Sequence, residues 1–301
     1  MRELNNKTLQ KYLDNNLKDI ETKCKNIIIK HKPKIVKFYN RYMGLFDAEK
    51  KLGHTNYTQN ENVISLLNNE YRELNFEEYD EMLSLERILH DTKYIEDLEV
   101  LRCRDDLLIN VREKINRYEV EFDKFHNALV KLNKRDISSS FGLFKYDEFE
   151  NCKIEIYILS CFLFCKRYKI DVVKFVLTTY AHELAHAFNY LGQDKDGEKW
   201  AYDDFRDANE TLIEGLAQYY AYEYAKDINI SKSFDQEVLL RNQDTNRLVL
   251  SKVYREYKKY QKYGREHVYG ALIYTRRNGI TNFKDFRNLL EIYKKDLPSE
   301  S

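Results

Sequence analysis

Two histidines four positions apart, with a glutamate between them, are the residues of this sequence best suited to chemistry. On a helix, His182 and His186 would lie one turn apart and project from the same face. Such a pair can bind one divalent metal ion, and Glu183 beside it is a candidate general base. With seven histidines in 301 residues, chance gives this pattern in roughly one chain in a hundred. The spacing therefore favours a metal site.

The residues around this pair predict a helix that begins after Asp171 and ends near Gly192. Aspartate is a favourable first cap and glycine a favourable last one. The side opposite the histidines carries apolar residues at helical spacing, which predicts that it is buried. These residues are Val173, Leu177, Tyr180, Leu184, Phe188 and Leu191. The face around the histidines carries polar residues and is expected to be open to solvent, as a hydrated metal site requires. These are Thr178, Thr179, Asn189 and Gln193.

A second helix, expected over residues 209–220, offers a third ligand for the same ion. Catalytic zinc sites use three protein ligands and keep a fourth position for water. Glu214 follows His186 by 28 positions, and Ala217 and Ala221 lie beside it on the helical wheel. Small residues on that face allow this helix to approach the first one closely. The sequence therefore predicts a metal site formed by the two histidines and Glu214.

Glu210 is the alternative carboxylate, because it lies one helical turn before Glu214 on the same face. It can act as the third ligand itself. It can also accept a hydrogen bond from a metal-bound histidine, a role that Gln218 could fill as well. The small residues beside Glu214 favour that residue as the ligand.

The composition indicates a mostly helical protein with a buried core. The chain is 43% hydrophobic and has only nine glycines and two prolines. Acidic and basic residues balance, so nothing points to nucleic acid as a partner. Neither a signal-peptide pattern nor a run of about 18 apolar residues is visible, so no membrane partner is expected. Five cysteines without a CxxC pair favour free thiols in a reducing cytoplasm, and Cys161 and Cys165 are predicted to be core residues.

Residues 1–135 are predicted to form a helical N-terminal domain that acts as a scaffold, selects the substrate or regulates the site. Apolar residues recur there at helical spacing, and this half contains no catalytic pattern. Pro33 is expected at the start of its second helix, and residues 52–60 are expected to form a polar loop. Further helices are predicted over residues 63–74, 77–90 and 106–132.

A stretch of small polar residues at 136–140 is the predicted boundary to a second domain, residues 136–301. Just after it, residues 141–146 and 153–158 indicate two antiparallel strands, the second with alternating apolar and polar side chains. A strand pair next to the metal-site helix offers an edge to which an extended peptide can bind. The predicted fold class is therefore mainly α with a small antiparallel β element (α+β).

The motif His182-Glu183-Leu184-Ala185-His186, followed by Glu214-Gly215-Leu216-Ala217, resembles that of the gluzincin metallopeptidases. It is similar to the aminopeptidase branch, although Ile213 stands where that branch has asparagine. A later stretch, His267-Val268-Tyr269-Gly270, is similar to the Tyr-x-x-Gly element of the branch, with His267 in place of the tyrosine. The resemblance covers roughly residues 141–290. It implies a zincin-like metallopeptidase domain that is preceded here by a helical domain.

The resemblance also implies a chemistry. A Zn²⁺ ion would be held by the two histidines and Glu214, and Glu183 would take a proton from the attacking water. His267, or failing it Tyr269 or Tyr263, would donate a hydrogen bond to the developing oxyanion. The amino-terminus-binding motif of the aminopeptidases is not visible. The sequence therefore predicts an endopeptidase that acts on peptide or protein substrates.

Two other functions fit the same residues. One is a non-catalytic interaction protein that zinc stabilises, although a purely structural site needs no base at Glu183 and closes its fourth position. The other is a peptidase toxin or effector that acts inside another cell. No feature of the sequence decides between a resident enzyme and an effector.

Overall fold

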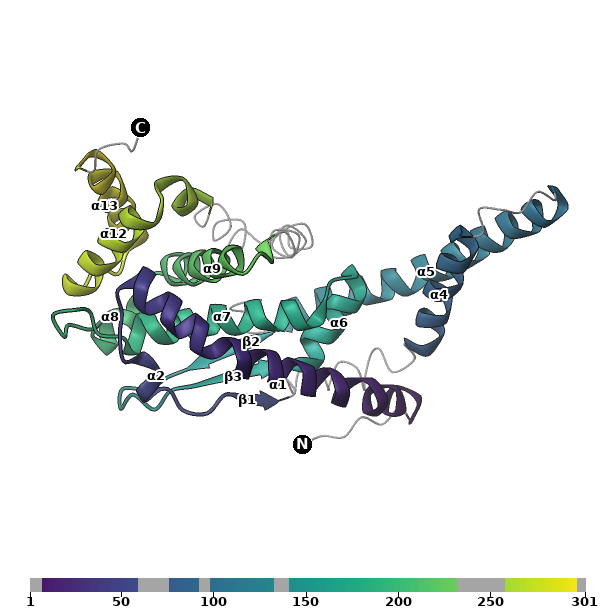
Figure 1. Ribbon diagram of the computed structural model, residues 1–301, viewed down its shortest axis with the longest axis horizontal. Helices are drawn as coiled ribbons and strands as arrows, with labels where there is room; N and C mark the ends of the chain where they lie inside the picture. The colour runs from purple at the N-terminus through teal and green to yellow at the C-terminus, as the bar shows by residue number, and fades with distance from the viewer. Residues whose placement is uncertain (1–6, 59–75, 92–97, 133–140, 232–257, 297–301) are drawn as a thin grey trace.

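The computed structural model describes residues 7–58, 76–91, 98–132, 141–231 and 258–296. These residues form a mainly helical body with one small mixed sheet, and a long helical hairpin reaches out from the body (Figure 1). The mainly α architecture with a small β element is confirmed.

Helix α7 (Val172–Leu191) runs through the middle of the body. It packs most extensively against α9 (Glu210–Asp227) on one side and α1 (Lys7–Met43) on another, and it also contacts the sheet (Figure 1). The elements around the candidate site are therefore placed by how they cover α7.

The predicted ends of α7 are confirmed. The Asp171 carboxylate accepts hydrogen bonds from the backbone N–H groups of Val173 and Lys174, at 2.9 and 3.1 Å, and so caps the first turn. Gly192 is the last cap, and its N–H donates to the carbonyl of Phe188. The two capping residues therefore set the length of the helix, as expected from their types.

The expectation that the histidine face of α7 is open to solvent is wrong. Every residue from Phe175 to Leu191 is buried, including Thr178, Thr179 and Asn189. The reason is tertiary: α9, α1 and the sheet cover this helix from different sides, and a single helical wheel does not reveal how many neighbours it has. The solvent that reaches the site must therefore occupy a cavity and not an open face.

The sheet contains the predicted antiparallel pair and one strand that was not predicted. Strands β2 (Gly142–Lys145) and β3 (Lys153–Tyr157) pair antiparallel, with Gly142 opposite Ile156. Strand β1 (Asn56–Thr58) pairs parallel to β3 on its other side, so the order is β1-β3-β2. The prediction of a loop over residues 52–60 is therefore wrong at its centre. With only three residues, β1 is too short for an alternating pattern to identify it, and its partner strand lies about a hundred positions away in the chain.

Helix α1 is longer than predicted because Pro33 does not start a new helix. It runs without a break for 37 residues, with Pro33 inside it. A proline removes one backbone hydrogen bond from a helix. Here the residue that loses its partner is Ile29, which is 69% exposed. Water can therefore replace the lost bond at little cost.

The first part of the chain belongs to the same core as the metal-site helix. The buried hydroxyl of Tyr39, on α1, donates to the carbonyl of Ala181, on α7, at 2.7 Å. One hydrophobic cluster extends from Leu17 to Leu290. Residues 7–58 are thus not packed as a unit of their own. The predicted boundary at residues 136–140 lies outside the described residues.

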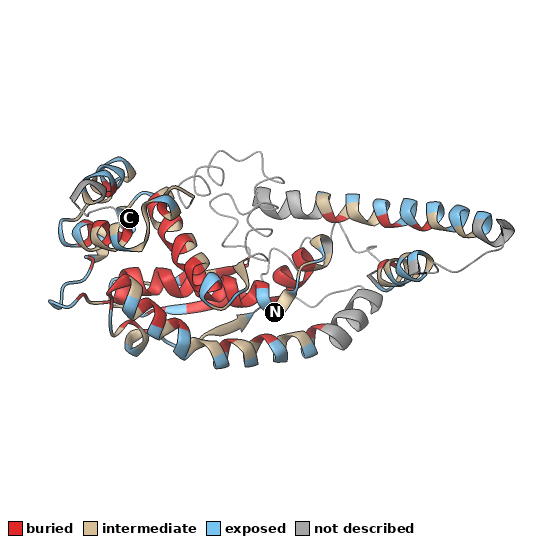
Figure 2. Cartoon of the chain, turned by 45° about the horizontal axis from the view of Figure 1, so that its top comes forward, coloured by how far each residue is buried: buried red, intermediate tan, exposed pale blue. Residues whose placement is uncertain are grey.

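The hairpin consists of α4 (Phe76–Asp91) and α5 (Leu98–Leu132), which confirms two predicted helices, the second with an earlier start. Figure 2 shows mostly exposed residues along its free part, in contrast to the buried centre of the body. A helix predicted over residues 63–74 lies outside the described residues. Among the described helices, none has the length and apolar character needed to cross a lipid bilayer.

The remaining helices complete the body. These are α2 (Ala48–Lys51), α6 (Ile158–Tyr168), α8 (Tyr202–Asp207), α12 (Arg265–Arg277) and α13 (Phe283–Asp296). The predicted core cysteines Cys161 and Cys165 lie on α6 and are buried, which confirms that prediction. All five cysteines are free thiols.

Candidate metal centre

Three predicted ligands converge at one point between α7 and α9. The Nε2 atoms of His182 and His186 are 3.1 Å apart. The two carboxylate oxygens of Glu214 lie 3.1 Å from Nε2 of His182 and 3.2 Å from Nε2 of His186. In a tetrahedral zinc site with bonds of about 2.1 Å, neighbouring ligand atoms are roughly 3.4 Å apart. The donor atoms are therefore spaced as the ligands of one small ion are, which confirms that these three residues form one group that could hold a metal.

This group is sheltered from solvent. His182 and His186 are buried, and the Glu214 side chain is 16% exposed. Burial alone would raise the pKa of Glu214. The attraction of His186 and the hydrogen bonds from both imidazoles outweigh it and hold the pKa of Glu214 well below its usual range. The carboxylate is therefore ionised at neutral pH, which is the form that binds a cation.

The N-terminal half of α9 brings Glu214 to this position. The side chain of Asn209 accepts a hydrogen bond from the N–H of Thr211 at 3.0 Å and caps the helix one turn before the ligand. Gly215 and Ala217, which follow Glu214, are buried. Small residues at a helix contact allow the two backbones to approach, as predicted.

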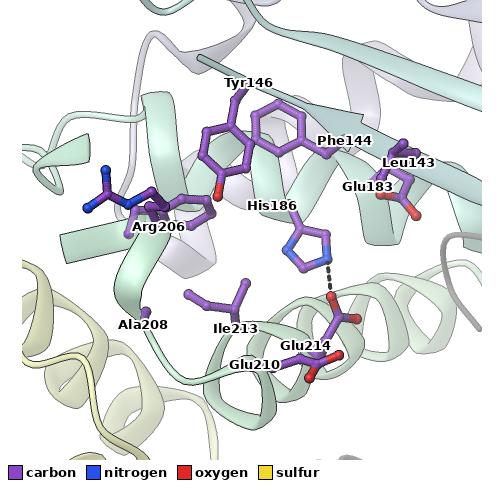
Figure 3. A pocket seen from close by; sticks show the side chains of 11 residues that line it. Leu143, Phe144, Tyr146, Glu183, His186, Arg206, Ala208, Glu210, Ile213 and Glu214 are labelled. Atoms are coloured by element: carbon purple, nitrogen blue, oxygen red, sulfur yellow. Dashed lines mark ion pairs between the residues drawn. The ribbon is translucent and has the colours of Figure 1, made fainter. Parts of the chain in front are cut away.

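Glu210 lies on the same helix, but its carboxylate is not part of the group (Figure 3). It is an exposed residue. Nearby protein atoms partly desolvate the Glu210 carboxylate, and this desolvation together with the negative charge of Glu214 raises the pKa of Glu210. The structure therefore places Glu214 and not Glu210 at the two histidines. Gln218, the other predicted second-layer residue, is half-buried on α9.

Glu183 faces the same cavity as two of the ligands. A cavity of about 190 Å³ is lined by Glu183, His186 and Glu214, together with residues from β2, from α8 and from the start of α9 (Figure 3). Glu183 itself is only 3% exposed. A water molecule in this cavity could thus meet both the predicted base and the predicted metal.

Gly142 has a role at this site that was not foreseen. A Cβ atom at position 142 would lie 2.9 Å from both Cγ and Oε1 of Glu183 and 3.0 Å from Cγ2 of Thr179. Real Cβ atoms almost never approach other atoms so closely, and here the neighbour is a buried side chain. The absent side chain of Gly142 therefore makes the space that Glu183 occupies. The role of Gly142 could be foreseen only from the crossing of β2 over α7 at this point, which the sequence does not reveal.

Tyr146 and Arg206 also line the cavity, and neither was singled out from the sequence. The Tyr146 ring extends over the cavity on the same side as His186 (Figure 3). Burial is the main cause that raises the pKa of Tyr146, with a smaller effect of Tyr202. Its hydroxyl therefore keeps its proton at neutral pH and can donate a hydrogen bond. Arg206 is paired with Asp203 at 2.8 Å and is held on the outer side.

The structure does not bring the predicted oxyanion donors to this cavity. His267 and Tyr269 lie on α12, and the described lining of the metal cavity includes neither. Tyr269 lines a second cavity near Gly44 instead. The hydroxyl of Tyr263, the further alternative, is hydrogen-bonded to Glu291. A role for any of the three in catalysis stays a prediction without geometric support.

Comparison of the chain with protein-family models, with curated proteins and with solved structures gave no match. The likeness to gluzincins is therefore carried by the residues of the motif alone. The structure adds to it that two histidines and one glutamate, taken from the motif, lie within ligand distance of one another.

Proposed function

We propose that this protein is a zinc-dependent peptidase that cleaves within peptide or protein substrates. The observation that carries the proposal is the convergence of Nε2 of His182, Nε2 of His186 and the Glu214 carboxylate within 3.2 Å of one another, beside a cavity that Glu183 also lines. A structural site would have no use for a buried carboxylate beside the ligands.

The donor set fits zinc better than the other common divalent ions. Two imidazole nitrogens and one carboxylate suit zinc, whereas calcium and magnesium prefer oxygen ligands only. Three protein ligands leave one position for water or substrate. Zinc bound there would polarise a substrate carbonyl and lower the pKa of a water ligand towards about 7.

Glu183 supplies the base. Its carboxylate lines the cavity next to His186 and Glu214, so it can take a proton from a water molecule held there. The same carboxyl group can then give the proton to the leaving amine. Because Gly142 leaves room for this side chain and β2 closes over it, the carboxylate is held in place during both transfers.

The free edge of β2 supports a peptide as the substrate. The N–H of Tyr157 donates to the carbonyl of Phe141, which fixes that pair as a hydrogen-bonded pair of the ladder. By alternation, Gly142 and Phe144 direct their backbone groups away from β3. In the described residues β2 has no second strand partner. An extended peptide that paired with this edge would pass next to Glu183.

Tyr146 is the residue best placed to assist at the developing oxyanion. It lines the metal cavity, and its hydroxyl keeps its proton because burial raises its pKa. A donor that is fixed before the reaction stabilises charge that appears only in the transition state. We therefore assign to Tyr146 the oxyanion-stabilising role that was predicted for His267.

The test combines metal analysis with a fluorogenic peptide library on three proteins: wild type, Glu183→Gln and Glu210→Gln. The second variant makes the same change in a glutamate that lines the same cavity. We expect one zinc per chain in all three, with turnover lowered by about 10²–10⁴-fold only in Glu183→Gln. Full activity in that variant would remove the assigned base. Zinc without any activity in wild type would favour the non-catalytic interaction protein.

A further inference from the structure

A second cavity, separate from the metal centre, lies where the end of α1 meets the start of α12. Its volume is about 610 Å³, compared with about 190 Å³ at the metal centre. The peptidase proposal does not use it. It is also of the size that small organic ligands occupy in proteins.

Cationic side chains from three separate parts of the chain surround this cavity. Lys37 and Arg41 come from α1, Lys195 from the loop after α7, and Arg265 from the first turn of α12. The single acidic residue of the described lining is Glu266. Basic residues near the end of one helix are common because they complement its dipole. That explanation covers α1 alone and does not account for the cations from the other two segments.

Three of the four cations form no ion pair with any residue that the structure describes. Arg265 is paired with the buried carboxylate of Glu223 at 2.6 Å and lies 4.1 Å from the ring centre of Tyr42, which holds it at the cavity wall. For Lys37, Arg41 and Lys195, the described part of the chain shows no ion pair. The cavity therefore has an excess of positive charge that a bound anion could compensate.

Neutral groups suited to an anionic ring compound line the same cavity. The amide oxygen of Asn40 is buried and has no hydrogen-bond partner among the described residues. Helix α12 begins after Gly264, which provides no side-chain cap, and its first two residues line the cavity. Phe46, which is 41% exposed, and Tyr269 provide flat apolar surface.

We propose that this cavity binds a phosphate-bearing small molecule of nucleotide size. Its phosphates would contact Lys37, Arg41 and Lys195, and a flat ring would lie against Phe46 and Tyr269. Phosphate is favoured over a carboxylate ligand because several uncompensated cations meet at one place, which suits a multiply charged group. A volume of about 610 Å³ is suited to a small molecule.

A ligand bound in this cavity would also stabilise the body of the protein. Phe46 and Gln193 exchange two backbone hydrogen bonds, at 2.8 and 3.0 Å, and so join the segment after α1 to the end of α7. A ligand that bridges α1, the loop with Lys195 and α12 would hold these segments together. We therefore expect it to raise the temperature of unfolding by linkage.

The test is titration calorimetry with ATP, inorganic pyrophosphate and adenosine, at low salt and without added metal. The site variant is Lys37→Glu/Lys195→Glu. The matched control is Lys34→Glu/Lys284→Glu, which reverses two exposed lysines that do not line the cavity. We expect one ATP or pyrophosphate per wild-type chain, no binding of adenosine, and affinity lowered by about 100-fold in the site variant, roughly 10-fold for each lysine. The control should stay within about twofold of wild type.

His186→Ala serves as a further control, because phosphates also bind metal ions. Its affinity should equal that of wild type. Absence of binding to wild type at millimolar ligand, equal affinity in the site variant and its control, or loss of binding in His186→Ala would each overturn the proposal. Equal affinity for ATP and pyrophosphate would overturn the ring contacts with Phe46 and Tyr269.

Discussion

Helices α7 and α5 carry similar sequence signals but lie in opposite environments. Both have apolar residues at helical spacing and polar residues between them. On α7, seventeen successive residues are buried, from Phe175 to Leu191. On α5, Val111, Ile115 and Phe122 are buried, while most of the residues between them are exposed (Figure 2).

The difference determines whether the polar groups of each helix need partners within the protein. A buried polar or charged group costs free energy unless it has a partner. On α7, His182 and His186 are buried together, and their interactions with the Glu214 carboxylate compensate that cost. On the hairpin, charged side chains are hydrated, and pairs such as Lys124 with Glu121 are exposed and contribute little. The group that could hold a metal therefore lies where burial makes polar groups depend on one another.

The largest contrast is expected between a buried and an exposed histidine. His186→Ala removes a ligand and leaves the Glu214 carboxylate with one imidazole. We expect loss of the metal and a fall in peptidase activity of about 10³-fold or more. His90→Ala changes a hairpin residue whose side chain is 50% exposed. This variant should keep its metal content and its peptidase activity within about twofold of wild type. Metal analysis and turnover measure the two effects. Similar losses in both variants would show that the buried histidine is no more important for metal binding than the exposed one.

A second contrast concerns stability. Leu184 stands between the two histidines in the sequence of α7 and is fully buried. Leu184→Ala is expected to lower the free energy of unfolding by about 2–5 kcal/mol. Ile88 on α4 is 60% exposed, and Ile88→Ala should change the free energy of unfolding by less than about 0.5 kcal/mol. Urea unfolding followed by circular dichroism gives both values. Equal losses would mean that the hairpin is packed as tightly as the body.

Gly142→Ala tests the space behind the base. The added methyl group would collide with Glu183, and displacement of a catalytic group by about 1 Å can cost 10²-fold in rate. We therefore expect kcat to fall by about that factor while the metal stays bound, since the atoms nearest to an added Cβ belong to Glu183 and Thr179 and not to a metal ligand. Unchanged kcat would mean that Glu183 can move without loss, which its role as base does not allow.

The smallest effect is expected where the hairpin meets the body. Lys166 on α6 pairs with Asp80 on α4, and burial lowers the pKa of Lys166 despite that partner. The unfolded chain then binds this proton more tightly, so stability should rise with pH from neutral towards 10.5, the usual lysine value. In Lys166→Met this rise should disappear, with a change of about 1 kcal/mol or less at pH 7. Unfolding at pH 7 and 9.5 would show it; an unchanged pH dependence would contradict the assignment.

Local signals made several features predictable from the sequence. The caps Asp171 and Gly192 define α7, and the small residues after Glu214 point to its helix as the neighbour of α7. The β2–β3 pair follows from alternation along β3. Each of these depends on residues that are close in the chain.

Features that depend on distant contacts could not be predicted in this way. Strand β1 has only three residues and is recognised as a strand through its pairing with β3. The burial of the polar face of α7 results from three separate neighbours, and the part of Gly142 depends on the crossing of β2 over Glu183. Tyr146 reaches the metal cavity from the end of β2, whereas His267, chosen by resemblance, lies on a helix outside its described lining.

The most direct test of the central claim is X-ray absorption at the zinc edge, with zinc content, on purified wild type and Glu214→Gln. The account predicts one zinc per wild-type chain with two imidazole nitrogens and light-atom ligands at about 2.0–2.1 Å. It also predicts weaker binding in the variant. Wild type without stoichiometric metal, or a spectrum that shows no imidazole ligation, would contradict it.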